Sequence, residues 1–153
     1  MKDTLKDKKA LWDKIKGIRF GMLTHRHPGG LLHSHPLATQ NQSLDDSTAL
    51  YFFIPRQSEM AALLREDAHV NVSYVSPDND SYVSIAGLAR ITHDLQRVRQ
   101  LWTPMAEVSF PKGPTDPDLA LLEVEIEHAQ AWEAAKGRMM PLFQPTRAPT
   151  LAT

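Results

Sequence analysis

The sequence predicts a mainly β fold with peripheral helices, in which six antiparallel strands form a small closed or split barrel. Three observations lead to this prediction. Six segments alternate apolar and polar residues or are rich in β-branched and aromatic residues. Short turn-forming stretches of Pro, Gly, Asn and Asp separate them. Helical spacing of apolar residues recurs before the first strand, between the third and fourth, and before the last.

The first half of the chain is expected to hold a helix and three strands. Leu5, Leu11 and Ile15 fall on one helical face, and the helix ends at Gly17. Strands are expected over 18–24, 31–39 and 48–54, the first two joined at a Pro-Gly-Gly turn. The third, TALYFFI, is apolar enough for a central strand.

The second half continues the pattern. Ser58 caps a helix, strands follow over 70–76 and 82–91, and a further helix starts near Asp94. Three prolines and a glycine over 110–117 indicate a shaped loop. A last strand over 119–126 reaches toward Trp132.

The length of 153 residues suits one domain. We assign residues 1–135 to the barrel. Residues 136–153 contain Pro141, Pro145 and Pro149 and little to bury, which predicts a loosely held C-terminal tail.

Composition excludes several classes of protein. The 17 basic and 18 acidic residues give a net charge of -1, without the basic excess of a nucleic-acid-binding protein. The absence of cysteine excludes disulfides and thiol chemistry and fits a reducing cytoplasm. There is no secretory signal core, and no apolar run approaches the roughly 20 residues that cross a bilayer. We therefore expect a cytoplasmic protein without membrane or nucleic-acid partners.

Four histidines lie within eleven residues, at His25, His27, His33 and His35. Each pair has i, i+2 spacing, so the two rings share a face of a strand, and a hairpin brings both pairs together. The rings serve either as polar side chains at a hairpin end or as ligands of zinc or haem. We assign no metal ligand from the sequence alone.

The junction from Phe52 to Met60 predicts an anion site. A strand here runs into a helix whose free N–H groups favour phosphate. Arg56 adds a cation and Ser58 a hydroxyl. Capping alone is the other explanation of this pattern. Among the aromatic residues outside the strands, Trp102 is the best candidate for the wall of a planar ligand, and core packing is the alternative.

Hydrolase, P-loop and dinucleotide motifs are absent. The order of segments, however, resembles the pyridoxamine 5'-phosphate oxidase-like split-barrel flavoproteins, and within them the general stress protein branch. The matching stretches cover nearly the whole chain and are LWDKIKGIRFGMLTH, HSHPLATQ, LYFFIPRQSEMAALL, VNVSYVSPDNDSYVSIAGLARI, LWTPMAEVSFPKGPTDPDLALLEVEIEHAQAW and KGRM.

The resemblance implies a six-stranded split barrel of the FMN-binding type and a homodimer with FMN at the subunit interface, FAD being the alternative cofactor. The second strand would lie along the flavin ring, the third strand and the following helix would hold the ribityl chain and phosphate, and two further residues would complete the pocket, in part from the partner subunit. The residues so implied are His35, Pro36, Leu37, Ala38, Thr39, Gln40, Phe52, Phe53, Ile54, Arg56, Ser58, Tyr82 and Trp102.

Three departures from the family pattern affect this expectation. Relatives commonly have arginine where His35 stands and lysine near Met60. Without these cations the flavin phosphate depends on Arg56, histidine and backbone donors, so we expect weaker FMN binding. The prolines of the tail also interrupt a segment that relatives often carry as a helix.

By resemblance, the protein is a flavin-binding general stress protein and a flavin-dependent oxidoreductase of unknown substrate, whose redox chemistry the cofactor carries. Two alternatives remain open at this point. The first is a non-catalytic flavin carrier or sensor, and the second is haem or metal binding through His25 to His35.

Overall fold

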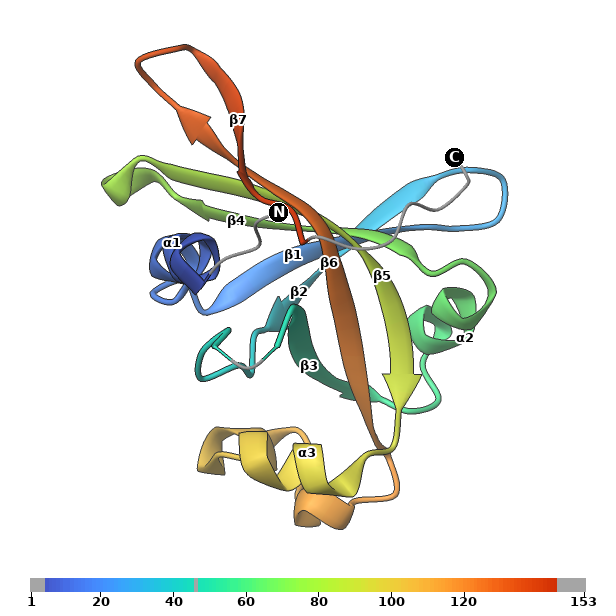
Figure 1. Ribbon diagram of the computed structural model, residues 1–153. Coiled ribbons are helices and arrows are strands. Elements are labelled where there is room, and N and C mark those ends of the chain that lie inside the picture. The colour runs from blue at the N-terminus through green and yellow to red at the C-terminus, as the bar shows by residue number, and fades with distance from the viewer. Residues whose placement is uncertain (1–4, 46, 146–153) are drawn as a thin grey trace.

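The computed structural model describes residues 5–45 and 47–145. Their strands form one antiparallel sheet that is curled into a half-barrel (Figure 1). The strands are β1 (Phe20–Arg26), β2 (Leu32–Ala38), β3 (Ala49–Pro55), β4 (His69–Ser76), β5 (Ser81–Thr92), β6 (Leu119–Glu133) and β7 (Arg138–Phe143). The helices are α1 (Leu5–Ile15), α2 (Glu59–Glu66) and α3 (Leu95–Leu101), with 3-10 turns η1 (Pro77–Asn79), η2 (Pro104–Val108) and η3 (Gly113–Thr115). The strand order β2-β1-β4-β5-β6-β3 confirms the predicted split barrel.

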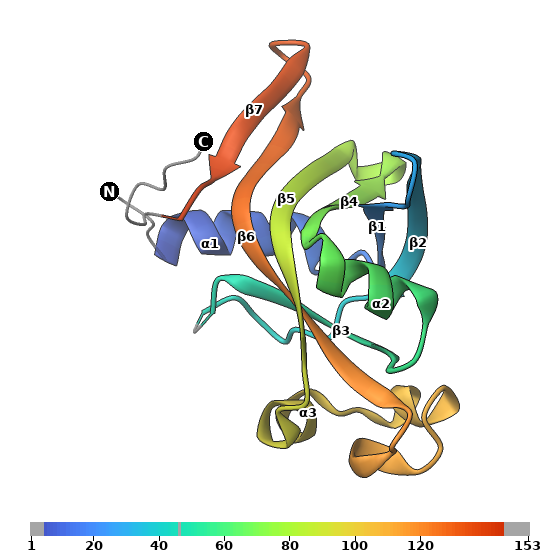
Figure 2. The same cartoon turned by 90° about the vertical axis from the view of Figure 1, so that its right-hand side faces the viewer.

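The three predicted helices are present, and two begin at the expected caps. The Ser58 hydroxyl accepts a hydrogen bond from the Ala61 N–H at 3.1 Å, and the Asp94 carboxylate accepts one from the Arg97 N–H at 3.1 Å. The α2 helix lies beside the β1–β2 hairpin in both ribbon views (Figures 1 and 2). No helix of the part that the structure describes is long and apolar enough to cross a membrane.

A bulge in the longest strand pair curves the sheet. The register of β5 against β6 shifts between Ala86 and Gly87. A Cβ atom at Gly87 would lie 2.5 Å from the Glu125 carbonyl oxygen, so only glycine lets the two backbones approach this closely. Bulges increase local twist and bend the strand that carries them. The curvature brings the two sheet edges, β2 and β3, toward each other.

Hydrogen bonds just after β2 join these edges. The Gln40 N–H donates to the Tyr51 carbonyl oxygen at 2.8 Å. The Asn41 side chain then continues the ladder, because its Oδ1 accepts from the Tyr51 N–H and its Nδ2 donates to the Ala49 carbonyl oxygen, both at 2.8 Å. The barrel is thus closed at this one end of the split.

The apolar core has two parts, and β3 contributes to both. One face of β3 packs Leu50, Phe52 and Ile54 into the barrel interior. The other face packs Tyr51 against α3 in a second cluster. The prediction that β3 is a central strand is wrong, since it pairs with β6 alone and forms a sheet edge. Its continuous apolar character reflects burial on both faces.

The prediction of a loosely held tail is wrong for the segment that forms β7. This strand pairs with β6, and Phe143 is buried in the main core. Pro141 is tolerated because it lies on an edge strand opposite Gln130, where the register shifts. The remaining part of the predicted tail, residues 146–153, lies outside the described residues.

Candidate functional site

A groove of about 540 Å³ runs between the end of β2, the edge strand β3 and the segment around η2. Its lining is mostly uncharged, and Arg19 is the one charged side chain among the described residues that form it. The lining residues are Arg19, Phe20, Pro36, Leu37, Ala38, Thr39, Gln40, Asn41, Gln42, Phe53, Thr103, Met105, Ala106, Ser109 and Phe110. Such a lining suits a largely apolar ligand that carries one negative group.

The edge position of β2 determines what the groove offers chemically. One side of this strand pairs with β1, and the other side carries no ladder before Gln40. An edge strand presents N–H and C=O groups that a heterocyclic ring can use as hydrogen-bond partners. The groove therefore combines an apolar surface with a row of backbone donors and acceptors.

Thr39 is held in place from behind by a buried phenol. The Thr39 and Tyr74 hydroxyls lie 2.5 Å apart and share a hydrogen bond. Tyr74 is fully buried in the barrel core, and this burial raises the pKa of its phenol to about 12, although the Thr39 hydrogen bond acts in the opposite direction. The phenol stays protonated over the whole physiological range.

An aromatic pair forms the far wall. Phe53 lines the groove, and the Trp102 ring packs against it with the ring centroids 5.5 Å apart and tilted by 37°. The Trp102 Nε1 atom is buried without a hydrogen-bond partner among the described residues. Trp102 thus supports the groove wall from behind.

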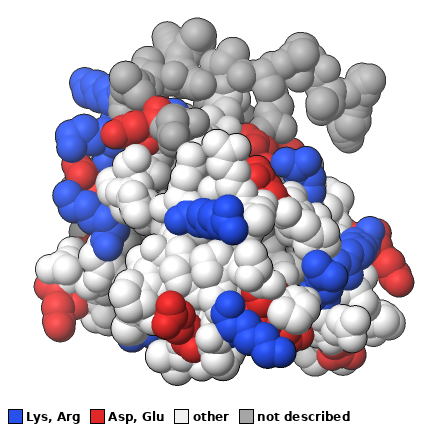
Figure 3. Space-filling view, turned by 90° about the horizontal axis from the view of Figure 1, so that it is seen from below, with Lys and Arg blue, Asp and Glu red and all other residues white. Residues whose placement is uncertain are grey.

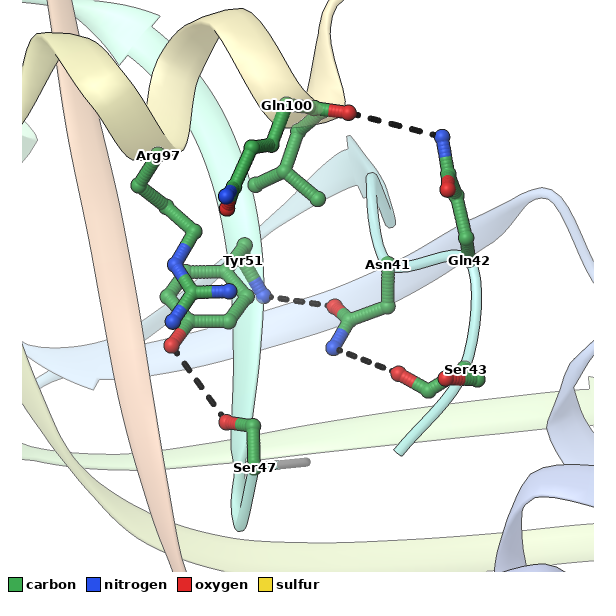
Figure 4. A pocket seen from close by; sticks show the side chains of 8 residues that line it. Asn41, Gln42, Ser43, Ser47, Tyr51, Arg97 and Gln100 are labelled. Atoms are coloured by element: carbon green, nitrogen blue, oxygen red, sulfur yellow. Dashed lines mark hydrogen bonds between the residues drawn. The ribbon is translucent and has the colours of Figure 1, made fainter. Parts of the chain in front are cut away.

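A second hollow, of about 330 Å³, adjoins the groove and shares Asn41 and Gln42 with it. Figure 4 shows the Arg97 guanidinium over the Tyr51 ring, at 5.0 Å from the ring centroid. The hydroxyl of Ser47 lies 3.3 Å from the Tyr51 hydroxyl. A cation and several neutral donors therefore lie immediately beside the uncharged groove.

The structure brings together six of the residues that the sequence assigned to a ligand site. These are Pro36, Leu37, Ala38, Thr39, Gln40 and Phe53. Phe52 and Ile54 are fully buried in the barrel, because alternate side chains of a strand point to opposite faces. Neither residue lines the groove.

The remaining predicted residues lie elsewhere in this chain. Arg56 lines a different hollow, where its Nη2 is 3.4 Å from His93 Nδ1. The Ser58 hydroxyl caps α2 and donates to the Pro55 carbonyl oxygen. Tyr82 lies next to the β4–β5 turn, paired with Val75. None of these three lines the groove.

His35 also has other partners, although it is the neighbour of the groove residue Pro36. Its Nε2 lies 3.2 Å from His25 Nε2. His25 is only 2% exposed, and this burial is the main cause that lowers the pKa of its imidazole. The charges of His27, His35 and His33 lower the pKa further. Glu59 acts in the opposite direction. His25 is therefore neutral near pH 7.

Several groove residues were not predicted from the sequence. Arg19, Thr103 and Ser109 come from segments outside the second and third strands. The sequence offers only the position of these residues next to an element: Arg19 directly precedes β1, and Thr103 and Ser109 flank η2. Only the strand order places these segments beside β2.

The fold and the groove define a small split-barrel protein with a groove along one sheet edge. A family model described as "Pyridoxamine 5'-phosphate oxidase like" matches residues 6–150. The chain belongs to this pyridoxamine 5'-phosphate oxidase-like family. No curated protein sequence matches it significantly.

Solved structures agree with this assignment. The general stress FMN/FAD binding protein of Xanthomonas citri is 26% identical, with a TM-score of 0.72 and 98% of each chain covered. A Clostridium acetobutylicum protein related to general stress protein 26 has a TM-score of 0.75 at 16% identity, covering 91% of this chain and 96% of its own. An FMN binding protein of Nostoc punctiforme has a TM-score of 0.66 at 16% identity, with 93% of each chain covered. The last two likenesses concern the fold alone.

The raised pKa of Tyr74 leads to a first prediction. Because its folded-state pKa of about 12 exceeds the ordinary value of 10.0, the folded state keeps a proton that the unfolded state loses. This contribution, about 3 kcal/mol, is complete below pH 10 and is lost as the pH rises toward 12. Tyr74→Phe should abolish this part of the alkaline stability loss, as measured by denaturant unfolding at several pH values. An unchanged alkaline profile in the variant would contradict the assignment.

Proposed function

We propose that the protein binds a flavin, FMN in the first instance, and acts as a flavin-dependent oxidoreductase in the general stress protein branch of its family. The observation that carries the proposal is the groove along the free edge of β2, whose described lining is uncharged except for Arg19. A flat, largely apolar ring with polar atoms at its rim needs this combination of apolar surface and backbone hydrogen bonds. The Xanthomonas citri relative, at 26% identity, is an FMN/FAD binding protein.

The two arginines beside the groove are the best candidates to bind the flavin phosphate. Arg19 lines the groove itself, and Arg97 lines the adjoining hollow. No carboxylate is present among the described residues that line either space, so nothing there opposes an anion. Arg56 and Ser58 remain the sequence-based candidates for phosphate contact.

We further propose that two copies of the chain enclose the flavin. Several large apolar side chains are exposed at the groove, Phe20 by 47% and Met105 by 55%, and Val108 beside it by 83%. The face seen from below shows broad uncharged areas, with a basic side chain in their midst and other charged side chains around them (Figure 3). A second copy would cover these side chains and close the groove. Residues such as Tyr82 would then serve the partner's site.

Bound flavin supplies the redox chemistry, and the chain's residues bind and orient it. Backbone groups of β2 hold the ring, Phe53 and Trp102 form a wall, and the Tyr74 phenol fixes Thr39. Among the described residues that line the groove, none carries a carboxylate, imidazole or thiol that could act as a general acid, a general base or a strong nucleophile. For this reason a flavin carrier or sensor, whose bound flavin does not turn over, is the second candidate function. The cytoplasmic location stays a prediction.

Flavin binding is tested by adding FMN to the purified chain and following the loss of its fluorescence. We expect saturable quenching at micromolar concentrations. Arg19→Gln should weaken binding by about tenfold or more, since hydrogen bonds to charged groups contribute about 1.5–3 kcal/mol. The exposed Arg65→Gln on α2, away from the groove and from α3, is the matched control and should leave affinity unchanged. No quenching by the unaltered chain would refute the proposal.

The dimer is tested by sedimentation velocity. Val108→Glu places a charge in the proposed interface, so we expect it to shift the protein toward monomer and to weaken FMN binding together. Leu31→Glu, at an apolar site that is exposed by 66% at the tip of the β1–β2 hairpin, should leave the dimer intact. A Val108→Glu protein that stays dimeric, or an unaltered chain that sediments as a monomer, would contradict the arrangement.

Anaerobic addition of NADPH or NADH distinguishes the two candidate functions. If the protein is an oxidoreductase that takes electrons from a nicotinamide, the visible absorption of its bound flavin will bleach, and readmission of air will restore it. We expect bleaching. A flavin that stays oxidised, while chemical reduction with dithionite succeeds, would identify a carrier.

A further inference from the structure

Four imidazoles lie on one face of the β1–β2 hairpin. In the antiparallel register, His25 is opposite His33, and Leu23 is opposite His35. Directly opposite residues of an antiparallel pair point to the same side, as do residues i and i+2 of one strand. His27 extends the row beyond β1. This arrangement is separate from the flavin groove, which none of the four histidines lines.

Three of these rings converge on one point. Possible ligand atoms of His25, His27 and His35 all lie within 4.8 Å of one another, and the Nε2 atoms of His25 and His35 are 3.2 Å apart. With zinc–nitrogen bonds of about 2.0–2.1 Å, two imidazole nitrogens of a tetrahedral site are separated by about 3.3 Å. The observed spacing thus matches a shared metal ion closely.

The two other buried nitrogens of the cluster lack partners. His25 Nδ1 and His27 Nε2 are buried and have no hydrogen bond among the described residues. Leaving a buried polar nitrogen unpaired costs about 1–3 kcal/mol. The His25–His35 contact can satisfy only one ring nitrogen of His25. A hydrogen bond between the His25 and His35 imidazoles therefore leaves His27 Nε2 unexplained, whereas a metal ion bound by His27 would give this nitrogen a partner.

The surroundings allow a cation to enter. His27 lines a hollow of about 370 Å³ at the hairpin end, together with Glu66 and Asp67 of the α2 segment. Arg26 lines the same hollow but lies 3.8 Å from the Asp67 carboxylate, which also binds His69. His33 stacks on His27 with the ring centroids 3.8 Å apart, which orients the His27 ring.

We propose that His25, His27 and His35 bind a divalent transition-metal ion of the zinc class, with His33 as a positioning residue for His27. Neutral imidazole is a preferred ligand of zinc, copper and nickel. Three protein nitrogens would leave a fourth position for water. Haem is a poorer fit, because its iron offers one axial position on each side of a wide ring, and these three rings converge from one face.

Zinc binding to the full-length chain, produced without a histidine tag, tests this inference. Isothermal titration with zinc chloride should give one ion per chain. His27→Gln and His35→Gln should each weaken zinc affinity at least tenfold. Changing a residue that only hydrogen-bonds to a metal ligand already weakens metal affinity roughly 10–100-fold, and loss of the ligand itself should weaken it more. The matched control is His93→Gln, whose histidine contacts Arg56 outside the cluster. It should bind zinc normally.

A second measurement distinguishes the site from loose binding. Cobalt(II) held by three imidazoles in a tetrahedral site absorbs strongly in the visible, and zinc should displace it stoichiometrically. We expect this spectrum from the unaltered protein and its loss in the His27 and His35 variants, with circular dichroism confirming that each is folded. Zinc binding that persists in both variants, or no stoichiometric binding at all, would overturn the inference. Neither outcome depends on flavin binding.

Discussion

The hydrogen bonds at Asn41 hold the two free edges of the curled sheet together, and the site geometry depends on them. Without them, only the Gln40–Tyr51 hydrogen bond would join β2 and β3 directly, apart from the five strand pairings of the main path. The Asn41 amide bonds to backbone atoms of both Tyr51 and Ala49 and so acts as a short substitute for a strand ladder. Because the Asn41 and Gln42 side chains also border the groove and the adjoining hollow, the same closure fixes the distance between the two spaces.

The edge strand β3 connects this closure to the core. Its inward side chains fill the barrel and its outward ones pack against α3, so the strand is held on both faces. The backbone edge away from β6 pairs with no described strand and is bonded to Gln40 and Asn41 at Tyr51 and Ala49. Rigid packing with a free hydrogen-bonding edge is the arrangement that a planar ligand requires. The wall residue Phe53 is positioned by this packing, and Trp102 at the end of α3 supports it. The groove is thus rigid where β3 forms it.

Strand alternation on β2 separates two chemically different surfaces. His35 turns toward the imidazole cluster, while Pro36 lines the groove. A shift of the β1–β2 register by one residue would exchange the two faces, so one pairing pattern determines both surfaces. The sequence indicated this possibility through the i, i+2 spacing of the histidines. It did not show that His35, implied as a flavin contact, points to His25.

The sequence by itself determined the three helices and the first six strands, because alternation, helical spacing and turn residues are local properties of the chain. It missed β7, which was predicted to be part of a loose tail. The caps at Ser58 and Asp94 were readable for the same reason. The tertiary structure alone decided which strands are edges, since apolar composition reports burial and not hydrogen-bond partners, as β3 demonstrates. It also decided that Arg19 lines the groove and that Arg56 does not. These positions follow from the strand order and the curvature of the sheet, and residues that are distant in the sequence contribute to both.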